Sequence, residues 1–160
     1  MKTHLILIIT GLAITACNSN QETENHTAHH DTSHAGHGHP KAKQLMELHD
    51  SMMPKMGEMM SVKKTLTSIV NEIESLNASS PSRELQKQKA EAQSLIAQLD
   101  EADKSMMGWM HQYKADTLEN LDAAQQDTYI GDQTAKMEVV NSQMRDAISR
   151  SEDFINNYKQ

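Results

Sequence analysis

The 160-residue sequence predicts an all-α protein, in which an antiparallel three-helix bundle or coiled coil follows a cleaved signal peptide and a disordered His-rich tether. From Lys41 onward, apolar residues recur every three or four positions, which is the period of an amphipathic helix. No segment shows a competing strand pattern. Aromatic residues make up only 3% of the chain, and a narrow bundle core built from aliphatic and methionine side chains needs few of them.

Residues 1–16 have the pattern of an export signal, with an apolar core at Leu5–Ile14 that is too short to span a bilayer as a permanent helix. The sequence Ile14-Thr15-Ala16-Cys17 resembles the bacterial lipobox, in which the cysteine becomes the lipidated first residue of the mature protein. Cys17 is the single cysteine of the chain, so the alternatives are a free thiol or an intermolecular bridge. We expect lipidation of Cys17, with two or more acyl chains for stable anchoring.

Residues 17–40 begin with this cysteine and continue as a polar segment too poor in apolar residues to order itself. The tether carries six histidines: His26, His29, His30, His34, His37 and His39. Imidazoles bind copper, zinc and nickel, so the tract predicts loose metal capture without fixed geometry. A polar linker that happens to be rich in histidine is the alternative.

The domain at 41–160 is expected to contain helices at roughly 41–77, 82–114 and 128–158. The first break is predicted with Ser80 as the N-cap and Pro81 in the first turn of the next helix. The second break is placed around 115–127. Short links between long amphipathic helices favour an antiparallel bundle.

Within these helices, Pro54 is expected to kink the first one, because it removes a backbone hydrogen bond. Gly57 and Gly108 are expected to allow close approach of neighbouring backbones.

Eight of the 12 methionines lie in two short stretches, HDSMMPKMGEMM (49–60) and MMGWMH (106–111). A turn near residue 80 brings these stretches to the same height on neighbouring helices. Thioether sulfur is a soft ligand that suits Cu(I), and it binds without losing a proton. The predicted inner metal site comprises His49, Met53, Met56, Met106 and Met110, with weaker candidates Met52, Met107, His111 and Met137. Packing of an aromatic-poor core is the alternative, because methionine fills irregular gaps.

Other classes of function find little support. The net charge of −7, with both signs mixed along the chain, gives no basic surface for nucleic acid. The chain has no HExxH sequence, no phosphate-binding glycine loop and no nucleophile elbow. Asp50 and Asp103 near the methionines are a weak acid–base signal, so we expect no enzyme.

The stretches QLMELHDSMMPKMGEMM (44–60) and DKSMMGWMHQYK (103–114) resemble a group of small helical lipoproteins of the Bacteroidota, some of which carry the label "viral A-type inclusion protein". The resemblance covers most of 41–160. It implies a lipid-anchored envelope protein with a helical domain, and it brings no activity or ligand set.

Together these observations predict a protein anchored in the cell membrane or outer membrane and facing the periplasm or the exterior. Its expected role is to bind soft metal, with copper fitting the ligands best, for buffering or delivery. The alternative is a structural or interaction module that contacts another envelope protein and has no metal role.

Overall fold

A computed structural model describes residues 39–158, which form three long helices and one short one. The helices are α1 (Pro40–Ser79), α2 (Arg83–Gln112), the 3₁₀-helix η1 (Ala115–Asn120) and α3 (Ala123–Tyr158). The all-α three-helix bundle predicted from the sequence is thereby confirmed. The signal peptide, Cys17 and five of the tether histidines (His26, His29, His30, His34 and His37) lie outside the described residues.

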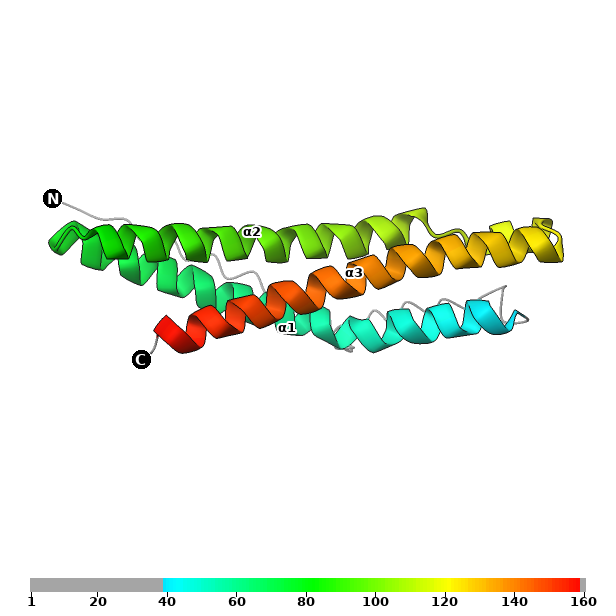
Figure 1. The fold of residues 1–160 in the computed structure, drawn as a ribbon, viewed down its shortest axis with the longest axis horizontal. Helices are drawn as coiled ribbons and strands as arrows, with labels where there is room; N and C mark the ends of the chain where they lie inside the picture. Colours follow the sequence, from blue (N-terminus) through cyan, green and yellow to red (C-terminus); the bar gives the residue numbers. More distant parts are fainter. Residues whose placement is uncertain (1–38, 159–160) are drawn as a thin grey trace, which may run out of the picture. The chain divides into compact units, whose positions relative to one another are not determined.

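The helices run up, down and up, and each contacts the other two (Figure 1). Three contacts fix the register of α1 against α2: Lys63 binds Asp100, Glu74 binds Lys89 at 2.7 Å, and the His49 ring stacks on Trp109. Paired residues of α1 and α2 therefore have numbers that add up to 158 at the His49–Trp109 contact and to 163 at the other two contacts. This register brings the stretch 49–60 level with 106–111, as the sequence predicted, because the helices turn back near residue 80.

The first link differs from the prediction in its capping residue. α1 continues to Ser79, and the N-cap of α2 is Ser82, where Ser80 was expected. The Ser82 hydroxyl accepts a hydrogen bond from the Glu84 N–H (3.2 Å), while its own N–H donates to the Asn77 side chain (3.0 Å). Asn77 thereby fixes the chain so that Pro81 stays in the link.

The second link is shorter than the predicted break at 115–127. Residues Ala115–Asn120 form η1, and α3 begins at Ala123, where the sequence predicted about 128. The reason is a reciprocal cap: the Asp122 carboxylate accepts from the Gln125 N–H (2.9 Å), and the Gln125 side-chain oxygen accepts from the Asp122 N–H (3.1 Å). Such a capping box satisfies two otherwise unpaired donors at a helix start.

Pro54 lies inside α1, which stays helical on both sides of it. In Figure 1, α1 changes direction within its cyan-to-turquoise portion, as a proline in a helix interior requires. The expectation for Gly57 and Gly108 was wrong. A Cβ added to either residue would meet no atom within 4 Å, so neither residue serves close backbone approach.

The core between the helices is aliphatic and rich in sulfur. Five methionines, which we call the methionine core, are each at most 2% exposed: Met52, Met59, Met106, Met137 and Met144. Lys41 pairs with Asp127, 86 positions later, so residues of α1 lie level with residues of α3 at about that separation. Met52, Met106 and Met137 consequently occupy one level of the core.

Candidate functional site

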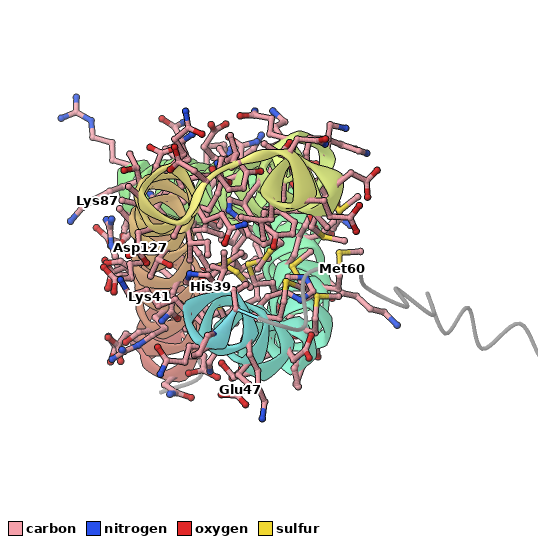
Figure 2. All side chains as sticks on the ribbon, turned by 90° about the vertical axis from the view of Figure 1, so that its right-hand side faces the viewer. His39, Lys41, Glu47, Met60, Lys87 and Asp127 are labelled. Carbon is pink, nitrogen blue, oxygen red and sulfur yellow. The ribbon has the colours of Figure 1, made fainter. Side chains whose placement is uncertain are left out.

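A second set of methionines lies at the edge of the core, where α1 and α2 meet. We call Met53, Met56, Met107 and Met110 the methionine seam. Met53 is 39% exposed, Met107 40% and Met110 36%, while Met56 is partly buried. In the view along the bundle, sulfur atoms gather beside α1 on its α2 side, with Met60 at the outer edge (Figure 2). These residues border the core, and three of the four are more than a third exposed.

Helix geometry explains why the seam side chains share this side of the bundle. Residues four or seven positions apart lie on one helix face. Met53 follows His49 by four residues, and Met56 precedes Lys63 by seven. Both His49 and Lys63 contact α2, so the two methionines point toward the same neighbour.

The same rule places the α2 half of the seam. Met107 follows Asp100 by seven residues, and Asp100 contacts α1 through Lys63. Met110 follows Met107 by three residues. Because the register puts Met53 level with the stretch 105–110, both halves of the seam lie at one height.

His49 lies at the same height and is held by two neighbours. Its Nδ1 is 2.9 Å from the Asp50 carboxylate, and its ring stacks on Trp109 with centroids 5.6 Å apart. A carboxylate can only accept, so the proton of this bond lies on Nδ1, and a neutral ring in this tautomer has its lone pair on Nε2. Histidines that ligate metals commonly donate their other ring nitrogen to a carboxylate in this way.

Trp109 belongs to an aromatic stack that the sequence did not predict. Its ring stacks on Tyr113 (5.1 Å) as well as on His49, and Tyr113 stacks on Tyr129 (6.2 Å). The indole N–H donates to the backbone carbonyl of Gln133 (3.3 Å). Burial, and then the neighbouring Tyr129, raises the pKa of Tyr113. The stack connects all three helices and fixes the plane against which His49 rests.

The structure separates the predicted inner ligands by depth. His49, Met53, Met56 and Met110 lie at the seam, whereas Met106 is fully buried in the methionine core. Of the weaker candidates, Met52 and Met137 also lie in that core.

Met107 was predicted as a weaker candidate than Met110, but the two have nearly equal exposure, 40% and 36%. His111, another of the weaker candidates, is exposed. His39, the one described tether histidine, has Nε2 3.5 Å from the Asp127 carboxylate.

Within residues 39–158, no group of three or more His, Cys, Asp or Glu side chains is arranged to hold a metal ion. The methionine seam offers thioether sulfur in this part of the chain. Sulfur ligands of this kind select soft ions such as Cu(I) over hard ones such as Mg²⁺ or Ca²⁺.

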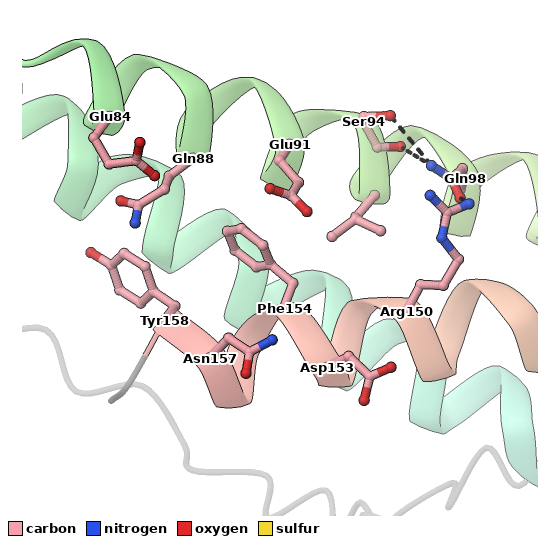
Figure 3. Close-up of a pocket in the computed structure, with 11 residues that line it drawn as sticks. Glu84, Gln88, Glu91, Ser94, Gln98, Arg150, Asp153, Phe154, Asn157 and Tyr158 are labelled. Atoms are coloured by element: carbon pink, nitrogen blue, oxygen red, sulfur yellow. Dashed lines mark hydrogen bonds between the residues drawn. The ribbon is translucent and has the colours of Figure 1, made fainter.

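A groove of about 440 Å³ lies between α2 and α3, away from the methionine seam (Figure 3). Its polar wall includes Glu84, Glu91 and Asp153, and Arg150 donates to Gln98 at 2.7 Å. Figure 3 shows Phe154 between the two helices. The groove offers neither a histidine nor a methionine, so it has no part in soft-metal chemistry.

Comparison with known protein families, curated proteins and solved structures finds no match for this chain. None of the helices among residues 39–158 has the length and apolar character needed to cross a bilayer.

Proposed function

We propose that this chain is a lipid-anchored envelope protein that binds a soft metal ion, with Cu(I) as the best fit, without catalysing a reaction. The ion is held by the His49 Nε2 and by sulfur atoms of the methionine seam. The tether histidines capture Cu(II) loosely, and Cys17 carries the lipid. The resemblance to helical lipoproteins of the Bacteroidota supports the anchor, and the residues alone support the metal.

The observation that carries the proposal is that His49, paired with Asp50, lies at the height of four thioethers, three of which are exposed. The Asp50 carboxylate leaves Nε2 of His49 as the ring atom with a free lone pair. Met53, Met107 and Met110 are each more than a third exposed, so an ion could reach their sulfur atoms without opening the core.

The exposure of the seam favours exchange over permanent storage. Ligands that remain open to solvent let a competing thioether or imidazole displace the ion, whereas an ion inside the methionine core could leave only after the helices separate. Buffering or delivery fits such a site better than a structural metal does.

The test uses the single tryptophan of the chain as a reporter, because Trp109 stacks on His49. Cu(I), added anaerobically to the full chain in detergent from a competing chelator, should quench Trp109 fluorescence with a stoichiometry of one. A variant with all four seam methionines changed to Leu keeps side-chain volume and should lose the response. Met60→Leu is the matched control. Met60 shares the helix face of Met53 and Met56 but lies a turn further along α1, level with residues 98–103 of α2, which include no methionine, so this variant should respond like wild type. Equal quenching in wild type and the seam variant would refute the inner site.

An interaction module is the second candidate, favoured by apolar side chains exposed away from the seam. Val139 on α3 is 57% exposed and Leu76 on α1 is 47% exposed. In this alternative the bundle packs against another envelope protein and the methionines fill space. A stoichiometric partner whose binding is lost with Val139→Ser, together with no metal response at Trp109, would favour it.

A further inference from the structure

We propose that the methionine seam is also a modification site, at which peroxide oxidises the thioethers to sulfoxides and thereby ends soft-metal binding. The metal half of this inference rests on the proposed function. The modification half, which is the oxidation itself, rests only on how exposed each methionine is.

The two methionine populations differ sharply in access. Each member of the methionine core is at most 2% exposed, whereas three of the four seam methionines are 36–40% exposed. Oxidation needs direct contact between sulfur and the oxidant, so susceptibility follows exposure. Adjacent residues make the contrast plain: Met52 is 1% exposed and Met53 39%, while Met106 is 0% and Met107 40%.

The reaction balances with a peroxide as the oxidant. A sulfur lone pair attacks one peroxide oxygen, an S–O bond forms and the O–O bond breaks. Sulfur loses two electrons, and the departing oxygen leaves as water after taking up the protons of the peroxide. The product is a sulfoxide, whose accessible donor is a hard oxygen. A Cu(I) or Ag(I) ion that prefers soft sulfur therefore loses its ligands.

The position of the seam explains why the bundle should survive this change. Sulfoxide is polar and disrupts a buried core, but the exposed seam side chains can turn the new oxygen toward water. The methionine core, which holds the three helices together, stays reduced. Oxidation can then change the ligand set while the scaffold persists.

The experiment treats the full chain in detergent with hydrogen peroxide and follows each methionine by peptide mass spectrometry, with and without Ag(I). Silver is chosen because Cu(I) would itself react with peroxide. We expect the exposed seam methionines to oxidise at least about tenfold faster than the methionine core, consistent with access-controlled chemistry. Bound Ag(I) should slow oxidation of the seam. Met60, which is 59% exposed and lies one turn beyond Met56, should oxidise rapidly whether or not Ag(I) is present.

Two results would overturn the inference. Equal oxidation rates for the seam and the methionine core would refute the modification site, and circular dichroism would show whether the helices had remained folded. Undiminished Ag(I) quenching of Trp109 after complete oxidation of the seam would refute loss of metal binding. If the reduced protein gives no Ag(I) response, the proposed function and the metal half both fail, while the order of oxidation still decides the modification half.

Discussion

Replacing Met106 or Met107 by Ala should have very different effects on stability, although the residues are neighbours in α2. Met106 is fully buried and level with Met52 and Met137, whereas Met107 is 40% exposed at the seam. Both substitutions make the same chemical change in the same helix, so their helix-propensity effects nearly cancel in the comparison. The difference then reports the depth of each side chain.

The magnitudes follow from burial. Truncating a fully buried methionine removes its transfer free energy and leaves a cavity, which typically costs about 2–5 kcal/mol. For Met106→Ala we expect about 3 kcal/mol, because its own helix and the two helices packed against it limit collapse of the cavity. Fully burying such a side chain contributes roughly 1.5–3 kcal/mol. Because Met107 is already partly in water, it contributes only a fraction of this, and Met107→Ala should cost about 1 kcal/mol or less.

Urea unfolding followed by circular dichroism measures both values, with the denaturant slope checked for constancy. Met52→Ala and Met53→Ala supply an independent pair on α1, with exposures of 1% and 39%. A difference below about 0.5 kcal/mol within both pairs would lie inside ordinary surface effects. Such a result would show that the helices are not rotated so as to bury Met52 and Met106 and expose Met53 and Met107. It would refute the division into core and seam.

Two further outcomes test the scaffold. Gly57→Ala and Gly108→Ala should each raise the free energy of unfolding by about 0.5–1 kcal/mol, because a Cβ meets open space and Gly is a poor helix former; a loss of stability in urea unfolding would instead reveal a close neighbour. The hydrogen bond and charge of Lys41, followed by the charge of His39, lower the pKa of Asp127. The contribution of this carboxylate is therefore present above its unfolded pKa and is lost as the pH falls through the lower folded value. Lys41→Met should raise the Asp127 pKa in an NMR titration, and an unchanged value would contradict the pairing.

Periodicity predicted the bundle because it reports the face that each helix buries. It could not predict the exact helix ends, since these depend on side-chain hydrogen bonds that several residues can make. Ser80 and Ser82 are both acceptable caps by composition, and the Asn77 side chain decides for Ser82. Asp122 with Gln125 carries a readable capping signal three residues apart, which could have placed the start of α3 at Ala123.

The height of the candidate site along the bundle was predictable, but the depth of its individual side chains was not. A turn near residue 80 sets the height, and a spacing of 100° per residue sets the angle. Exposure depends also on where the neighbouring helix passes and where it stops. Met106 is fully buried between the helices, whereas Met110, one turn later on α2, is 36% exposed. The stack of His49 on Trp109 was not predicted, because sequence spacing does not show which aromatic side chains of neighbouring helices will be in contact.

The two methionine populations also explain why Leu is the informative substitution. At a core position, methionine is used for its volume, and Leu supplies nearly the same volume. At a seam position, more than a third of the side chain of Met53, Met107 or Met110 contacts water, so little packing is at stake. Thioether and isobutyl groups differ there mainly in whether they can donate a sulfur lone pair. Seam substitutions by Leu should therefore change ligand binding without changing the fold, and core substitutions by Leu should leave the ligand set of the seam intact.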